Sequence, residues 1–242
     1  MLQPERINSD EARTRIAAAR PEAVCICAYG ALIKEPLLSE HPMLNVHPSL
    51  LPRWRGAAPI ERAIEAGDRK TGVSIMRPTA EMDAGPVCLA RSEPIRPDDD
   101  YGSLSARLAD LGGELLVEAL DTSPPTREQP EEGVTIAPKI GPEDRALDGS
   151  LEAGALERRI RALTPHVGAY LILPGGERLG VRKAAVSDAP PPPPSELSVD
   201  GDRLLYGCVD GALELVEVQP AGGRPMDAAA YLRGHGAQLR TT

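Results

Sequence analysis

The sequence predicts an α/β protein with two domains, a mostly parallel sheet domain followed by a small β-barrel domain. Helix-like and strand-like segments alternate through the first half of the chain, which favours βαβ units. Linker-like residues, rich in proline and glutamate, interrupt this pattern at 121–133. Short strand-like segments with turn residues between them then recur, which is typical of a small barrel. We therefore expect a first domain over 1–127, a linker over 128–148 and a second domain over 149–242.

Elements of the first domain follow from local signals. Ser9 is a good N-cap and is followed by good helix formers, and Gly67 ends a second helix-like segment. Leucines spaced by three and four predict a third, longer helix. The expected helices are 9–20, 60–66 and 104–120. Short apolar runs of strand length lie at 23–29, 43–46, 71–76 and 86–90.

In the second domain, Leu156, Ile160 and Leu163 mark the apolar face of an amphipathic helix. The strands expected after it are 169–173, 179–186, 203–208 and 212–218. Five consecutive prolines at 190–194 cannot form a central strand, because proline lacks the N–H group that a sheet requires. We expect this run to form a loop of the barrel.

Composition limits the possible functions. The net charge of −9 argues against bulk, non-specific binding to nucleic acid. The four cysteines lack metal-type spacing, and Cys25 and Cys27 fit one face of a buried strand. Reduced cysteines favour a cytoplasmic protein. No apolar run approaches the ~20 residues that a membrane-spanning helix needs.

Residues 45–60 are the most informative segment of the chain. Asn45 and His47 lie two apart in an extended run, so both side chains are expected to point into one crevice. A proline-bracketed loop, 48–52, follows them immediately. An amide donor beside a titratable donor can stabilise a developing oxyanion. The segment therefore predicts a catalytic site.

Asp83 is the third catalytic candidate. It follows the strand expected at 71–76, in a loop that also contains Gly85 and Pro86. In an open parallel sheet, loops at the carboxyl ends of strands line the ligand crevice, so Asp83 and His47 are expected to meet there. A nearby carboxylate is expected to raise the pKa of His47 and favour the imidazolium. Taken one at a time, each of these residues is more often an ordinary turn or loop residue, but their joint arrangement around so distinctive a segment favours a catalytic set.

Other kinds of site are less consistent with the sequence. The four histidines form no metal-ligand pair, so we expect no metal. Neither a nucleophile elbow nor a phosphate-binding glycine loop is present. The reaction is therefore expected to proceed by direct attack of the acceptor, without a covalent enzyme intermediate.

Two groups of arginines could either contact nucleic acid or simply lie on a solvated surface. Arg53 and Arg55 flank Trp54 and could contact phosphate and a stacked base, or could form a solvated loop. A second group lies on the helix near 156–163 and could also contact a phosphate backbone, but a solvated helix face is the more common explanation. It consists of Arg158, Arg159 and Arg161.

At these residues the chain resembles the methionyl-tRNA formyltransferases. Asn45-Val46-His47-Pro48-Ser49-Leu50-Leu51-Pro52 is similar to the hallmark of enzymes that use 10-formyltetrahydrofolate, and the continuation to Ile60 is similar to their tRNA-modifying branch. Other matching segments are 2–7, 28–30, 137–139, 219–222 and 231–234, together with Met226.

The resemblance implies a Rossmann-like formyltransferase domain and an OB-like second domain that helps to hold tRNA. It implies that Asn45 and His47 bind the formyl oxygen and that Asp83 orients His47. The donor would be 10-formyltetrahydrofolate and the acceptor the α-amino group of methionyl initiator tRNA, with no metal. A monomer is expected. The residues implied to bind folate are Tyr29, Gly30, Ala31, Leu32, Ile33, Ser49, Leu50, Leu51 and Pro52; those implied to bind tRNA are Arg53, Trp54 and Arg55.

The sequence also departs from the family pattern. It begins where the family has already formed its first strands, so an N-terminally truncated sheet is expected. Pro42 and Gly149 stand where the family usually has a glycine and an Asp-Trp pair. Two alternatives to tRNA formylation therefore stay open. One is formyl transfer to a nucleotide or sugar amine, and the other is a non-catalytic remnant that binds folate or RNA.

Overall fold

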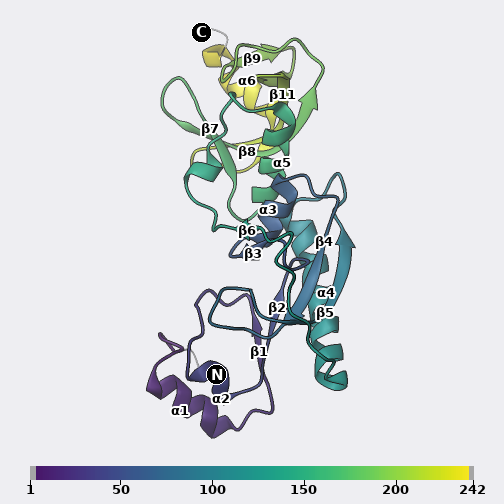
Figure 1. Cartoon of the computed structure of the whole chain (residues 1–242). Helices are drawn as coiled ribbons and strands as arrows, with labels where there is room; N and C mark the ends of the chain where they lie inside the picture. The colour runs from purple at the N-terminus through teal and green to yellow at the C-terminus, as the bar shows by residue number, and fades with distance from the viewer. Residues whose placement is uncertain (1–3, 240–242) are drawn as a thin grey trace. The chain divides into compact units, whose positions relative to one another are not determined.

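The computed structural model describes residues 4–239, so Leu2 and Gln3 of the matching segment at 2–7 lie outside the described residues. The chain divides into two compact units (Figure 1). The first comprises 1–60, 69–95 and 105–139, and the second comprises 61–68, 96–104 and 140–242. The first unit carries the predicted catalytic residues, and the second carries the predicted barrel.

Apart from α2, β3 and β6, the elements from α1 to β6 occur close to where the sequence predicts them. Ser9 caps α1 by accepting a hydrogen bond from the Ala12 N–H at 3.2 Å, as expected of an N-cap. The short elements α2, β3 and β6 were not predicted. The bounds are α1 Asp10–Ala19, β1 Val24–Cys27, α2 Leu37–Glu40, β2 Met43–His47, β3 Arg55–Gly56, α3 Pro59–Glu65, β4 Lys70–Met76, β5 Val87–Pro94, α4 Tyr101–Thr122 and β6 Ile136–Ala137.

The prediction of a mostly parallel sheet was wrong. The main sheet of the first unit has the order β1-β2-β4-β5, and only the β1–β2 pair is parallel. The connection between β4 and β5 runs only from 77 to 86 and contains no helix. A parallel crossover needs a dozen or more residues, usually with a helix, so β5 must return antiparallel to β4.

Different helices cover the two faces of this sheet. On one face, Leu37 of α2 and Ile33 pack with Met43 of β2. On the other face lies α4, where an added Cβ at Gly112 would meet the Val46 side chain at 2.8 Å. The main chain of α4 therefore approaches the sheet closely.

The expectation that Cys25 and Cys27 lie on a buried strand face was also wrong, because both are exposed. In the described part of the chain, β1 has a neighbouring strand, β2, on one side only. Residues adjacent in register share a face, so both cysteines lie on the Val46 side of the sheet. The α4 contact at that face is made with β2 and β4 instead.

The second unit is built around an antiparallel sheet with the order β7-β8-β11-β10-β9, and β12 also pairs with β11. Between residues 4 and 239, no pairing joins β7 to β9, so the sheet is not closed into a barrel by hydrogen bonds. Helices α5 and α6 lie against it and complete its apolar core. The bounds are η1 Glu143–Arg145, α5 Ala153–Leu163, β7 Ala169–Ile172, β8 Arg178–Ser187, β9 Leu197–Asp200, β10 Arg203–Cys208, β11 Gly211–Pro220, β12 Met226–Asp227 and α6 Ala228–Leu239.

Helices and strands of the second unit mostly match the prediction. The predicted strand at 203–208 is β10, and the helix marked by Leu156 and Ile160 is α5. Strands β9 and β12 and helix α6 were not predicted. Across the described residues, each helix is too short or too polar to cross a membrane.

Candidate active site

Strand β2 presents the two central side chains on one face of the sheet. Met43, Asn45 and His47 alternate along the strand and so share one face; Met43 and His47 are buried there and Asn45 is half-buried. His47 is only 4% exposed and pairs in register with Ser74 of β4. The predicted shared direction of Asn45 and His47 therefore follows from the strand itself.

Hydrogen bonds hold the loop after β2 in place. The Ser49 hydroxyl donates to the Arg53 carbonyl at 2.6 Å. The Ser74 hydroxyl donates to the Ser49 carbonyl at 2.7 Å and accepts from the Leu51 N–H at 3.1 Å. Both serines are fully buried, so their hydroxyls shape the loop from inside. The wall of any adjoining site is left to the half-buried residues 50–52.

The His47 ring has an oxygen near each nitrogen. Its Nε2 lies 2.9 Å from the Trp54 carbonyl oxygen and donates to it. Its Nδ1 lies 3.6 Å from Oδ2 of Asp83, beyond hydrogen-bond length. Trp54 itself has a positive φ of 63°. These contacts fix the plane of the imidazole beside the Asp83 carboxylate.

Asp83 is held against the turn that follows Trp54. Its Oδ2 accepts a hydrogen bond from the Gly56 N–H at 2.9 Å. Gly56 has φ 120°, and an added Cβ would lie 2.6 Å from the Ala137 carbonyl oxygen. Only glycine fits this position, because both the backbone conformation and the space exclude a side chain. Residue 56 must therefore be glycine for its backbone N–H to lie where it donates to the Asp83 carboxylate.

The predicted meeting of His47 and Asp83 is confirmed, but the reason given for it was wrong. Strand β4 is antiparallel to β2, so its last residue, Met76, lies beside Asn45 rather than beyond His47. The loop 77–86 then brings Asp83 to His47. A loop contact therefore places the carboxylate, and a common edge of parallel strands does not.

The structure also corrects the predicted protonation of His47. Burial disfavours the charged ring and lowers the pKa of His47 below its ordinary value of 6.5. The Asp83 carboxylate and the Trp54 carbonyl raise the pKa, but their effects are smaller than that of burial. His47 is therefore a neutral imidazole at neutral pH, with Nδ1 available to accept a proton.

The predicted folate loop, 29–33, follows β1. Because β1 and β2 are parallel and in register, the loops after them leave the sheet at the same edge. Tyr29 and Leu32 in this loop are each 46% exposed. Asn8 anchors the loop, accepting from the Lys34 N–H at 2.8 Å and donating to the Leu32 carbonyl at 2.9 Å.

The three predicted tRNA contacts differ in their surroundings. The Arg53 guanidinium lies over the Trp54 ring, 4.3 Å from its centre. Arg55 is 12% exposed, donates to the Gln129 side chain at 2.9 Å and lies 3.9 Å from the Glu81 carboxylate. The contacts of Arg55 are therefore internal, and its role toward tRNA stays a prediction.

The arginines of α5 also make internal contacts. Arg158 donates to the Glu65 carbonyl and Arg159 to the Glu65 carboxylate. Arg161 pairs with Glu157 and donates to the Asp99 carbonyl at 2.7 Å. These contacts favour a structural role over a phosphate-binding face.

Sequence reasoning missed the contribution of residues 127–137 to the site. Gln129 donates to the Asp83 carbonyl at 2.8 Å, and Thr135 accepts from the Trp54 N–H at 2.8 Å. Strand β6 then pairs with β3 beside Gly56. These residues follow Ser-Pro-Pro and surround Pro-Glu-Glu-Gly, a composition that indicates a linker. Such a composition gives no sign of the contacts that these residues make.

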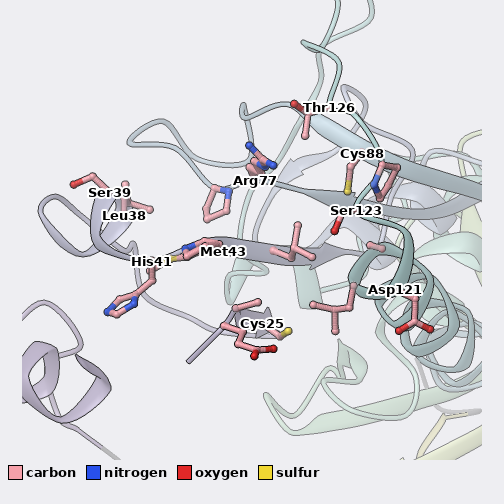
Figure 2. A pocket seen from close by; sticks show the side chains of 18 residues that line it. Cys25, Leu38, Ser39, His41, Met43, Arg77, Cys88, Asp121, Ser123 and Thr126 are labelled. Atoms are coloured by element: carbon pink, nitrogen blue, oxygen red, sulfur yellow. The ribbon is translucent and has the colours of Figure 1, made fainter. Parts of the chain in front are cut away.

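A separate hollow of about 1130 Å³ lies at the other end of the same sheet (Figure 2). The starts of β1 and β2, α2 and the residues after it, the start of the 77–86 loop and the end of α4 all contribute to its lining. The lining residues include Cys25, His41, Met43, Arg77 and Asp121. No predicted site residue is among them. Among the described residues, no group of histidine, cysteine, aspartate and glutamate is suited to hold a metal.

Two family models match the chain. One, described as formyl transferase, covers residues 1–120. The other, described as formyl transferase C-terminal domain, covers residues 139–236. Together they include Asn45, His47 and Asp83 in the first unit and the antiparallel sheet of the second.

Individual relatives agree with these matches. The methionyl-tRNA formyltransferase of Mycobacterium avium is 42% identical over 248 residues, which cover 97% of this chain and 78% of the relative. That of Paracoccus denitrificans is 43% identical, over 96% of this chain and 77% of the relative. HypX from Aquifex aeolicus, solved in complex with tetrahydrofolic acid, has a similar fold, with a TM-score of 0.67. HypX is 21% identical to this chain, and the match covers 88% of this chain and 38% of HypX.

Proposed function

The chain belongs to the methionyl-tRNA formyltransferase family, and from this membership we propose how its site carries out formyl transfer. The donor is 10-formyltetrahydrofolate, and the acceptor is the α-amino group of methionine on initiator tRNA. The reaction forms a C–N bond to the amine and breaks the C–N bond to folate N10. One proton moves from the amine to N10. The observation that supports this most directly is the contact of His47 with Asp83 beside Asn45.

Neutral His47 is the proton acceptor in this mechanism. Its Nε2–H group is already donated to Trp54, so Nδ1 takes the proton that the amine loses on attack. The imidazolium that forms lies 3.6 Å from the Asp83 carboxylate, which stabilises its charge. Asp83 therefore acts after proton transfer, and His47 returns the proton to the folate nitrogen.

Asn45 supplies the electrostatic part of catalysis. Its side chain shares the face of β2 with His47, and an amide N–H there can donate to the formyl oxygen as negative charge develops. Removing one donor of this kind typically lowers kcat by about 10²–10³-fold. Because the charge exists only in the transition state, the effect falls on kcat rather than on KM.

The folate is proposed to bind between the loops that follow β1 and β2. The pterin lies against the backbone of 29–33, with the exposed side chains of Tyr29 and Leu32 beside it. The half-buried residues 50–52 form the opposite wall, and the buried hydroxyls of Ser49 and Ser74 stiffen their backbone. Tetrahydrofolic acid in the HypX complex supports the assignment to a folate.

The tRNA is proposed to contact Arg53 and Trp54, with help from the second unit as an OB-like module. The stacked pair of Arg53 and Trp54 offers a cation and an aromatic face, which suit phosphate and a base. We place the reaction in the cytoplasm, where initiator tRNA is charged, and expect the chain to act as a monomer.

Transfer of labelled formyl from 10-formyltetrahydrofolate to charged initiator tRNA tests this function. His47→Ala is expected to abolish transfer by this 242-residue chain, and Asn45→Ala is expected to lower kcat with little change in KM. His235→Ala is the matched control, because His235 bonds the Tyr231 carbonyl within α6. Preference for a sugar amine over charged tRNA in a competition assay would favour the small-amine alternative. Absence of any transfer, with folate still bound, would favour the non-catalytic one.

A further inference from the structure

The position of Asp83 within its loop matters to the proposed mechanism. Its φ is +51°, a left-handed conformation that aspartate adopts more readily than most residues other than glycine. Its carboxylate has to remain near His47 Nδ1 and the Gly56 N–H for the proposed mechanism. Side chains from outside the loop that contact its backbone are therefore candidates for keeping the carboxylate in place.

Gln129 makes those contacts through its side-chain amide. Its Nε2 donates to the Asp83 carbonyl at 2.8 Å and to the Gly85 carbonyl at 2.7 Å. Its Oε1 accepts from Arg55 Nε at 2.9 Å. Two carbonyls face the nitrogen and a guanidinium faces the oxygen, so the partners determine the orientation of the amide. One side chain thus joins both sides of the catalytic loop region.

Gln129 is itself held at both ends of its segment. Two residues before it, Arg127 exchanges two backbone hydrogen bonds of 2.8 Å with Val87 at the start of β5. Six residues after it, the Thr135 carbonyl accepts from the Arg55 N–H at 2.9 Å. Residues 127–135 therefore span from β5 to β3, with Gln129 at the Asp83 loop between them.

We propose that Gln129 is a positioning residue for formyl transfer, which fixes the Asp83 carboxylate relative to His47 and to the Arg55–Gly56 turn. The inference rests on the proposed function, because it assigns Gln129 to that reaction. Gln129 acts on His47 only through Asp83. Replacing Gln129 is therefore expected to displace the Asp83 carboxylate without removing a reacting group. A displaced carboxylate would stabilise the His47 imidazolium less.

Gln129→Met tests this, because methionine keeps the length of the side chain but cannot make the three hydrogen bonds. We expect kcat to fall roughly 10- to 100-fold, since a displacement of about 1 Å can cost 10²-fold, with KM for the folate changed much less. The acid limb of the pH–rate profile is expected to move to lower pH, because Asp83 no longer raises the pKa of His47. A purely structural role would leave that limb unchanged.

Gln219→Met is the matched control. Gln219 makes a similar amide clamp in the second unit, accepting from Arg182 at 2.9 Å and donating to the Gly223 carbonyl at 2.9 Å. It should leave the pH profile as in the wild type. If Gln129→Met lacks a cooperative melt, Gln129→Glu replaces it, because glutamate still accepts from Arg55 but cannot donate to the two carbonyls.

Titration of His47 by NMR in isotope-labelled chain, without substrate, separates this inference from the proposed function. A lower titration midpoint for His47 in Gln129→Met than in wild type supports the positioning role even if transfer to tRNA is never seen. Wild-type transfer together with an unchanged His47 midpoint and an unchanged pH profile in the variant would overturn the role of Gln129 alone.

Discussion

At the scale of single residues, His47 illustrates how a local pattern and its surroundings can oppose each other. The neighbouring carboxylate suggests a charged ring, but the ring is 4% exposed and burial has the larger effect on its pKa. A neutral base with a carboxylate beside it suits a reaction in which the amine must lose a proton. The same residues thus support a different protonation state from the one that sequence reasoning predicts.

This protonation state predicts the pH dependence of the reaction. Because the pKa of His47 in the folded chain is below 6.5, kcat/KM should be constant near neutral pH and fall as the pH drops through that lower pKa. The measurement is the pH–rate profile of formyl transfer. An acid limb with its midpoint above 6.5 would contradict neutral His47, and Asp83→Asn should move the limb further down.

The same shift affects stability. Between the folded pKa of His47 and 6.5, the unfolded chain binds a proton that the folded chain does not. His47 therefore makes the folded state less stable as the pH falls through this range.

At the scale of elements, the close approach of α4 to the sheet explains why one position of this helix tolerates no side chain. Gly112 and Gly113 are neighbours in α4, but only Gly112 faces the sheet, where an added Cβ would meet Val46 at 2.8 Å. Gly113 has nothing within 4 Å of such a Cβ and is exposed. The sequence shows two adjacent glycines, and only the packing distinguishes them.

Alanine at each of these glycines should therefore have opposite effects. Gly113→Ala is expected to stabilise the chain by about 0.5–1 kcal/mol, because alanine has the better helix propensity. Gly112→Ala is expected to destabilise it by roughly 1–3 kcal/mol through overpacking against β2. Urea unfolding measures both changes. Equal effects of the two substitutions would show that α4 does not approach β2 as described.

Ion pairs that join two elements differ in how deeply they are buried, and their expected contributions to stability differ accordingly. Arg62 of α3 donates two hydrogen bonds of 2.9 Å to Asp144 of η1 and a further one of 2.8 Å to Glu65. The Arg62 and Asp144 side chains are 14% and 17% exposed. The Arg62 guanidinium lowers the pKa of Asp144 below its ordinary value of 3.8.

Arg62→Met is expected to destabilise the second unit by about 1.5–3 kcal/mol at pH 7, the range for hydrogen bonds to charged groups. Asp144 has a lowered pKa, so its contribution is present above pH 3.8 and is lost as the pH falls through the folded value. The difference between variant and wild type should shrink accordingly. Arg13→Met, which breaks the more exposed pair with Glu40, should have a much smaller effect.

At the scale of the whole molecule, the two compact units contain different features. The first contains the predicted catalytic and folate residues and has an exposed edge strand, β1, in the described part of the chain. The second has its own apolar core between the antiparallel sheet and its helices. Ligand binding and overall stability can therefore be probed separately.

Folate should stabilise only the unit that binds it. A folate present at 100 times its Kd is expected to add about 2.7 kcal/mol to the stability of the binding unit, if it binds only the folded state. Calorimetry should show an upward shift of the transition assigned to the first unit and little change in that of the second. A broad, folate-indifferent melt would contradict catalysis by this chain and favour the remnant interpretation.

The sequence by itself determined the features that depend on neighbours along the chain. The N-cap at Ser9, the helices α3, α4 and α5, and the common face of Asn45 and His47 all follow from local periodicity. The family also follows from contiguous residues, because the segment 45–60 carries it. Most strands of both units were predicted within a few residues for the same reason.

Only the tertiary structure decided the features that depend on contacts between distant segments. These are the antiparallel direction of β4 and β5, the exposure of β1, the lowered pKa of His47 and the contacts of Gln129. Gln129 and Asp83 are 46 positions apart, and periodicity carries no information over such a distance. Burial and hydrogen-bond partners arise from packing, so they determine the chemistry of residues that the sequence could only locate.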